Sequence, residues 1–453
     1  MGSSGLDLST IASDLLGSSS STGFDVPIIV SEVLQSQSQE ETLWQSEETT
    51  FNNQSTALQQ LSSQLQTLLN DANALTDPLG SFAAVNATVS DSSALTATAA
   101  SGAAVGSHSI TVNSLATTSS YYSNELATSS TTFGTGSITL QVGSGPAATI
   151  TVDDTDNTLA GLAAAINNQH LGVTANVITD SAGARLTLVS NTSGGAGSIQ
   201  ISSNSTGLTF SGSQGQDASL TVDGIPIDSS SNTVTSAIPG VTLDLLAETS
   251  SPVTLQLSAG TSQAASAINS FVSDYNTIIS SINSAVSYNT STSTAGTLMG
   301  DSSVEMVQST LLTDATASMS GNDGITSLAS LGISMNEDGT LSVDDSQLTS
   351  ALSTNFQAVQ NFFQNTSTGF AQKLSSDLSN LTDPTNGPIA IDLNGIDSSV
   401  SALKSEISDF QANLATEQQS LTTYYSNINA TLQELPSMLS SINAQLANLK
   451  TSS

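Results

Sequence analysis

The feature that most constrains the fold is an apolar repeat over roughly the last fifty residues. Between Val400 and Leu449, apolar residues recur at alternating steps of three and four, with small slips and one interruption at Glu417. A repeat sustained over about seven heptads is typical of a long coiled-coil helix. The apolar side of such a helix is unfavourable in water, so the sequence predicts a partner helix.

A shorter repeat near the other end can supply that partner. From Leu58 to Leu75, apolar residues again follow steps of three and four. We therefore predict that the two ends pair as a stalk, with the residues between Asp77 and Ala259 inserted into it. The predicted coiled-coil residues are Leu58, Leu61, Leu65, Leu68, Leu403, Ile407, Phe410, Leu414 and Leu421. Replacing Leu65 or Leu414 by Asp is expected to unfold the stalk, because a buried unpaired carboxylate costs several kcal/mol.

The charge balance excludes some partners. The chain of 453 residues has four Lys and Arg against 38 Asp and Glu, a net charge of −34. Without a basic patch it is expected to bind neither nucleic acid nor an anionic membrane. With so few cations, the stalk register is expected to rest on apolar residues. We also hypothesise that the composition suits an acidic medium, where protonation relieves self-repulsion.

Several missing sequence features narrow the class of protein further. Cysteine is absent, which excludes disulfides and thiolate metal sites. No apolar run approaches the length of a membrane span. The first residues lack the pattern of a cleavable signal peptide. The cytoplasm and export by a system that reads an uncleaved N-terminus both remain open at this point.

The middle of the chain changes from helical to alternating patterns. Short apolar alternations separated by Ser and Gly turns predict strands over 82–89, 94–99, 109–113, 220–222, 241–246 and 253–257. Residues 137–201 predict two hairpins crossed by a short helix at 158–167. Helical spacing resumes at Thr261, and Asp338–Gly339 predicts a hairpin within it.

The predicted fold class is multidomain α+β, with a helical coiled-coil stalk from both chain ends carrying nested, mainly antiparallel β-domains. Its predicted parts are a mobile N-terminal arm (1–44), a stalk helix (45–80), a β head in two pieces (81–131 and 206–260), an inserted α+β domain (132–205), a helical stalk domain (261–429) and a C-terminal arm (430–453).

The residues that could take part in catalysis or metal binding have simpler structural interpretations. His108 and His170 lack a second ligand at metal spacing, which favours surface or turn roles. The carboxylates of 153–156 could ligate calcium, but the segment lacks the glycine and distal glutamate of a calcium loop, so a turn before a helix is favoured. The segment 336–339 is likewise interpreted first as a hairpin turn. No catalytic triad, phosphate loop or cofactor motif is present, so neither an enzyme nor a cofactor or metal is predicted.

Six segments in order resemble the flagellar hook-associated protein 2 family. Each is weak alone, and their order makes the resemblance specific. The segments are 93–99 (SALTATA) with 105–116, 218–224 (ASLTVDG) with 232–243, 271–276 (FVSDYN), 300–303 (GDSS), 331–341 and 348–359. Residues 137–201 are similar to the insertion repeat of flagellin-type proteins.

The resemblance implies a non-catalytic capping protein at the tip of the bacterial flagellar filament. It implies a ring of identical subunits, expected to be a pentamer, that promotes folding and insertion of exported flagellin. The partners implied are the chain itself, flagellin and the filament end, and the flagellar type III export apparatus with its chaperone. The implied location is extracellular. Other axial proteins (a hook–filament junction protein or flagellin) and a cell-surface adhesin are the alternatives.

Under this interpretation the apolar residues of the two ends are the contact arms toward the filament or other subunits. They are Ile28, Ile29, Val30, Val33, Leu34, Leu435, Leu439, Ile442, Leu446 and Leu449.

Overall fold

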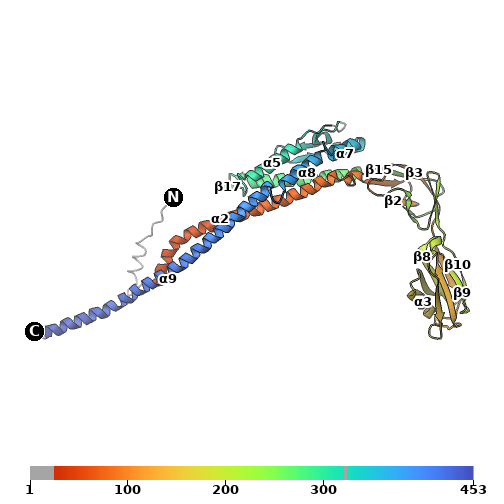
Figure 1. Cartoon of the computed structure of the whole chain (residues 1–453), viewed down its shortest axis with the longest axis horizontal. Coiled ribbons are helices and arrows are strands. Elements are labelled where there is room, and N and C mark those ends of the chain that lie inside the picture. The colour runs from red at the N-terminus through yellow and green to blue at the C-terminus, as the bar shows by residue number, and fades with distance from the viewer. Residues whose placement is uncertain (1–24, 321–323, 452–453) are drawn as a thin grey trace.

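The molecule is elongated, with a helical leg at one end and two β-domains at the other (Figure 1). This computed structural model describes residues 25–320 and 324–451, with side chains to residue 445. Both chain ends contribute to the leg, and the β-domains are nested between them. The predicted fold class is confirmed.

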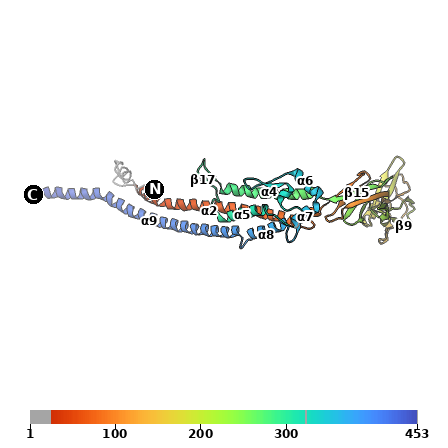
Figure 2. The ribbon, with the colours of Figure 1, turned by 90° about the horizontal axis from the view of Figure 1, so that it is seen from above.

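Two long helices form the length of the leg, and shorter elements pack on the end nearest the head (Figure 2). The long helices are α2 (Val26–Thr76) and α9 (Pro388–Thr451). The shorter helical elements are η1 (Ser81–Ala83), α4 (Thr261–Val286), α5 (Ser302–Ala315), η3 (Leu328–Leu331), α6 (Asp345–Thr354), α7 (Phe356–Gln364) and α8 (Phe370–Leu381). The small hairpins are β16 (Tyr288–Asn289) with β17 (Thr294–Ala295), and β18 (Ile333–Met335) with β19 (Leu341–Val343). The second hairpin confirms the turn predicted at Asp338–Gly339.

The two long helices begin earlier than the sequence predicted. The predicted mobile arm extended to residue 44, but α2 is already helical from Val26. Its second residue is Pro27, whose fixed φ suits a first helical turn and whose missing N–H costs nothing there. In the same way α9 begins at Pro388, before the apolar repeat that starts at Val400. Residues 1–24 of the predicted arm lie outside the described residues.

The sequence predicted that the leucines of α2 pair with the C-terminal repeat, and the structure gives most of them other partners. Leu58, Leu65 and Leu75 belong to one core that α4 to α8 and the first turns of α9 complete. Aromatic side chains close this core, and Phe362 stacks on Phe370 with ring centroids 5.5 Å apart. The two chain ends do run together, but the repeat from Leu403 onward faces an earlier part of α2, described below.

Phe82 corrects another prediction. The strand expected from 82 to 89 begins only at Val85, and Phe82 lies in η1. Its ring stacks on Phe363 with centroids 5.4 Å apart, inside the leg core. This side chain therefore ties the start of the head to the leg.

The head has two antiparallel sheets that enclose one apolar core. The five-stranded sheet has the order β1-β15-β3-β11-β12, from β1 (Val85–Val89), β15 (Val253–Ala259), β3 (Gly106–Ser114), β11 (Ala218–Val222) and β12 (Ile225–Ser229). The three-stranded sheet joins β13 (Thr233–Ile238), β14 (Val241–Leu245) and β2 (Leu95–Ala99). Asp223 and Gly224 link β11 to β12 with φ of 50° and 84°, as a tight hairpin turn requires.

The inserted domain is larger than the predicted module of 132–205. One of its sheets contains β6 (Ala148–Val152), β5 (Gly136–Val142) and β9 (Ile199–Asn204). The other contains β10 (Phe210–Ser213), β4 (Thr118–Ser123), β8 (Ala184–Ser193) and β7 (Val173–Thr179). Helix α3 (Leu159–Asn168) packs between them, and η2 (Gly195–Gly197) follows β8. Tyr121 and Phe210 contribute to its core from outside the predicted bounds, because β4 and β10 complete the second sheet.

Candidate assembly surface of the helical leg

Beyond the core, the leg narrows to two antiparallel helices whose register three polar contacts define. Gln37 Nε2 donates to Glu417 Oε1 (3.3 Å), Gln411 Nε2 donates to Glu41 Oε1 (2.5 Å), and Lys404 Nζ lies 3.6 Å from Glu48 Oε1. Each step forward on α2 thus matches one step back on α9. The sequence predicted a register held by apolar residues alone, and glutamine–glutamate hydrogen bonds prove to supplement them where cations are scarce.

Little apolar surface is buried in this two-helix segment. The rings of Trp44 and Phe410 meet edge to face, with centroids 5.2 Å apart. Leu403 and Ile407 are buried, whereas Phe410, Leu414 and Leu421 are only half-buried. Two helices cover one side of each other and leave the rest to water, so burial falls along the leg.

The last part of α9 extends past the start of α2. The register places Val26 level with about residue 427. The helix continues to Thr451, about 35 Å further at the usual rise per residue. Figure 1 shows α9 alone at this end of the molecule. Described residues of α2 therefore cannot cover it.

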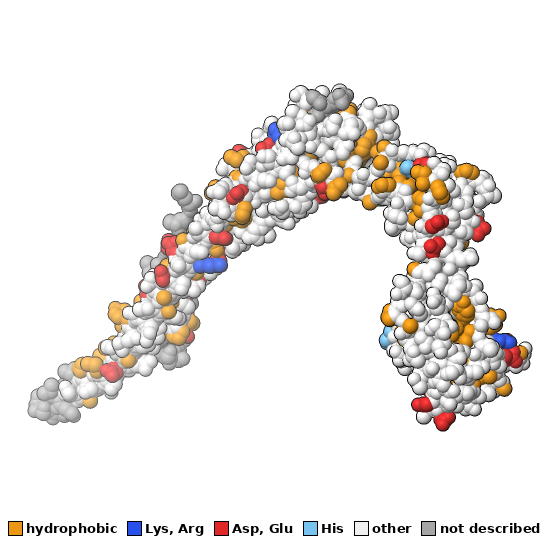
Figure 3. Space-filling model, turned by 45° about the vertical axis from the view of Figure 1, so that its right-hand side comes forward, with side chains coloured by type: hydrophobic (Ala, Val, Ile, Leu, Met, Phe, Trp, Pro, Cys, Tyr) orange, Lys and Arg blue, Asp and Glu red, His pale blue; other side chains and the backbone are white. Residues whose placement is uncertain are grey.

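An apolar stripe is exposed on this extension. Leu432, Leu435, Leu439 and Ile442 follow steps of three and four, and the last three are 43%, 57% and 50% exposed. Glu434 is the one charged residue between 429 and 445. Figure 3 shows orange side chains among mostly white atoms, with few red ones, toward this end of the leg. Leu446 and Leu449 continue the spacing, but their side chains lie outside the described residues.

The predicted N-terminal arm residues do not behave as one surface. Val30 is buried, Ile28 is half-exposed, and Ile29, Val33 and Leu34 are partly buried. All lie in the first turns of α2, in the two-helix segment. They contribute to the helix pair, while the C-terminal stripe stays exposed beyond the described part of α2.

The residues that could have performed other chemistry have local structural roles. Asp153 Oδ1 accepts from Thr155 N (2.8 Å) and its hydroxyl (2.6 Å), which builds the turn before the Thr158 cap of α3. Asp338 Oδ1 accepts likewise from Thr340 in the β18–β19 hairpin. These hydrogen bonds lower the pKa of both carboxyl groups.

His108 has a partner that the sequence did not indicate. Its Nδ1 lies 2.7 Å from Asp223 Oδ2, and Asp223 Oδ1 accepts from Ser109 N. The pairing of β3 with β11 brings residues 115 positions apart together. Only the strand register could have revealed this contact. His170 stands in a turn with φ of 51°.

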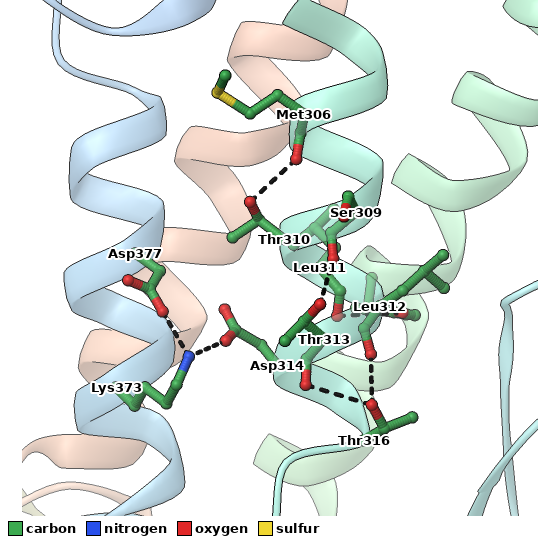
Figure 4. A network of polar contacts seen from close by, with 11 residues as sticks. Met306, Ser309, Thr310, Leu311, Leu312, Thr313, Asp314, Thr316, Lys373 and Asp377 are labelled. Carbon is green, nitrogen blue, oxygen red and sulfur yellow. Dashed lines mark hydrogen bonds and ion pairs between the residues drawn. The ribbon is translucent and has the colours of Figure 1, made fainter.

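A charged cluster at the edge of the leg core was also not predicted. Lys373 Nζ on α8 contacts both Asp314 Oδ1 on α5 and Asp377 Oδ2, as Figure 4 shows. Asp314 is only 2% exposed, and its Oδ2 has no hydrogen-bond partner. Burial raises the pKa of Asp314 above its ordinary value, although Lys373 opposes the rise. The cluster joins two helices through one of the chain's few cations.

In the described part of the chain, every helix falls short of the length and apolar character needed to span a membrane. Fold and surface together define an elongated multidomain protein whose helical leg carries an exposed apolar stripe near its end.

Family models identify the group to which this architecture belongs. The N-terminal model of flagellar hook-associated protein 2 matches residues 22–119, and its C-terminal model matches residues 215–437. The flagellin hook IN motif matches residues 137–192, within the inserted domain. The chain belongs to the flagellar hook-associated protein 2 family.

Individual relatives agree with this assignment. The B-type flagellar hook-associated protein 2 of Pseudomonas aeruginosa is 30% identical over 375 residues, covering 74% of this chain and 79% of the relative. The A-type protein of Pseudomonas aeruginosa is 28% identical over 357 residues, covering 71% and 74%. The crystal structure of the D1-D2-D3 domains of the flagellar cap protein FliD from Escherichia coli has a TM-score of 0.59 and 29% identity, covering 75% of this chain and 99% of that one.

Proposed function

We propose that this chain caps the growing flagellar filament and promotes folding and insertion of exported flagellin. Family membership supports this role, since relatives are named hook-associated proteins and a structural neighbour is named a cap protein. The role is structural, without catalysis. The comparisons support capping over the alternatives of a junction protein, a flagellin or an adhesin.

The single observation that carries the proposal is the uncovered apolar stripe at the end of α9. Leu435, Leu439 and Ile442 are each about half-exposed, on a stretch of α9 (429–445) whose one charged residue is Glu434. An apolar helix face of this kind fits a groove or another helix, where it is buried on docking. We propose that it docks into the filament end, and that Leu446 and Leu449 continue it.

The other end of the molecule supports the remainder of the proposal. The head and inserted domain lie far from the α9 end (Figure 1). If the legs stand on the filament, these β-domains are placed to form the outer plate. We propose that copies associate there as a ring, most simply a pentamer. The proposed route is the flagellar type III system with its chaperone, without a cleavable signal peptide, to the filament tip outside the cell.

The test is filament growth in a cap-deficient strain that expresses variants of this chain with its cognate flagellin. Removing 430–453 is expected to abolish growth while leaving the helical signal of the remaining leg intact. Residues 1–44 should be kept, since 26–44 stabilise the leg by pairing with α9. The triple variant L435D/L439D/I442D is expected to behave like the truncation, and L43D, on an exposed position of α2, like the parent.

Normal filaments from the triple variant would overturn the role of the stripe. Ring formation is tested separately by light scattering over a concentration series. A closed oligomer of about five or six subunits is expected. A monomer both in solution and on filament ends would overturn the ring.

A further inference from the structure

The leg contains carboxyl groups that face each other between helices without a cation. We propose that two such pairs, Asp71–Asp274 and Asp301–Asp392, form a pH-sensitive lock, in which each pair shares one proton in mildly acidic medium and thereby joins two helices. The lock concerns the leg itself and does not depend on the capping role.

The first pair joins α2 to α4. Gln64 Nε2 donates to Ser281 Oγ at 3.1 Å, which fixes the register of these antiparallel helices. Two turns further along α2 stands Asp71, and two turns back along α4 stands Asp274. The same register therefore brings the two carboxyl groups together.

Asp71 is short of a hydrogen-bond donor. Its Oδ2 atom is buried and has no partner. Two ionised carboxylates can only accept, so a proton is the one donor that this pair can provide for itself. Burial and the neighbouring Asp274 carboxyl raise the pKa of Asp71 to about 6. The protonated pair satisfies the buried oxygen.

The second pair joins α5 to α9. Ser303 Oγ donates to the Pro388 carbonyl at 3.3 Å, which brings the starts of the two helices together. Asp301 caps α5 by accepting from Ser303 N and Val304 N through Oδ1. Asp392 stands one turn into α9. Burial and the adjacent Asp301 carboxyl raise the pKa of Asp392 to about 6.

The surrounding charges do not offer these pairs a cation. Among the described cations, Lys373 contacts Asp314 and Asp377, Lys404 lies near Glu48, and Arg185 is in the inserted domain. The charges on the packed helices are otherwise acidic, with Asp377 on α8, Glu305 on α5 and Asp397 on α9. Helix α7 has no charged residue, and α2 has none between Glu48 and Asp71. Proton sharing is the available means of relieving the repulsion.

The direction of the pH effect follows from the proton balance. A carboxyl group whose pKa is higher in the folded than in the unfolded chain binds its proton more tightly when folded. The stabilisation is therefore complete below about pH 4 and is lost as the pH rises through about 6. A carboxylate held by a salt bridge would show the opposite trend. The net charge of −34 also makes the folded chain more stable in acid, because protonation reduces self-repulsion. The test must therefore separate the effect of the two pairs from that of the overall charge.

The test compares variants with the same charge change in the full chain. Thermal unfolding is followed by helical circular dichroism at pH 5 and pH 7. In D71N the amide can donate to Asp274 at any pH, and in D392N it can donate to Asp301. We expect each variant to lower the unfolding equilibrium constant at pH 7 by roughly tenfold, less than the full shift would give because the sites are partly exposed. The pH 5 to pH 7 difference in midpoint should shrink accordingly.

The matched control is D397N, which removes one charge from an exposed position of α9. We expect it to leave the pH difference close to that of the parent. D274N tests the first pair from the other side and guards against a packing effect specific to Asp71. If D71N, D274N and D392N change the pH difference no more than D397N does, overall charge explains the trend and the lock is overturned. A parent that is more stable at pH 7 than at pH 5 would also overturn it.

Discussion

The upper half of the leg, next to the head, and the lower half, beyond the core, contain the same two long helices, α2 and α9, but bury them very differently. Near the head, Leu58 and Leu65 are fully buried, because α2 packs against several other elements at once. In the lower half, α2 and α9 pack only on each other among the described elements, and Leu414 and Leu421 are only half-buried. The apolar spacing is similar in both halves. The number of helices around a position, more than the repeat itself, decides how much each residue stabilises the leg.

The largest loss of stability is expected from L65D, which replaces Leu65 in the upper half of the leg. Its side chain is completely buried, so an aspartate there has neither a partner nor water. We expect a loss of at least about 4 kcal/mol, enough to unfold the leg core. Circular dichroism at 222 nm and denaturant titration measure it. L43D is the matched control on the same helix, since Leu43 is 69% exposed, and an equal loss in both variants would contradict the comparison.

The second largest loss of stability is expected from K373M, at the edge of the same core. The change leaves Asp314 buried without its cation, so we expect a loss of about 2–3 kcal/mol at pH 7. The loss should be smaller at pH 5, because burial raises the pKa of Asp314 and the protonated carboxyl needs no cation. Urea unfolding at both pH values measures the difference. A loss that does not depend on pH would show that Lys373 acts through packing instead.

A smaller effect is expected from F410A in the lower half. The variant removes the edge-to-face contact with Trp44, whose ring is only half-buried. We expect a loss of about 1–2 kcal/mol, confined to the two-helix segment. Trp44 is the only tryptophan, so its fluorescence reports on this contact directly. Unchanged emission in F410A would mean that the two rings do not meet in solution.

The smallest effect is expected from L414D, where the structure revises the sequence-based expectation. The repeat alone predicted that this change would unfold the stalk. Leu414 is only half-buried, so the new carboxylate can reach water. We expect a loss of about 1 kcal/mol or less, visible as faster amide exchange around residue 414. Collapse of the whole helical signal would restore the original interpretation.

The sequence could predict the long helices, the nested strands and several turns, because local spacing and turn residues decide them. Asp338–Gly339 and Asp223–Gly224 formed the hairpin turns that their residues require. The starts of α2 and α9 were placed too late, although a proline favours the first turn of each helix and apolar residues are buried there, Val26 and Val30 in α2 and Ile389 and Ile396 in α9.

The contacts between distant segments could not be predicted. The sequence contains two repeats of equal spacing, which led us to pair them, whereas Leu58 and Leu65 lie in one core with α4 to α8 and only the first turns of α9. The partners of Asp71, His108 and Asp314 depend on helix and strand registers that no local pattern determines. The exposed stripe was within the predicted arm, but the pairing of the N-terminal residues with α9 was not expected.

The central claim is that the end of α9 is uncovered in the free chain and becomes covered on the filament. Hydrogen–deuterium exchange along α9, with and without filament ends, tests it most directly. We expect residues 388–407 to be protected throughout, and residues 430–445 to exchange rapidly in the free chain and slow down on the filament. Strong protection of 430–445 in the free monomer, or no gain on the filament, would contradict the account.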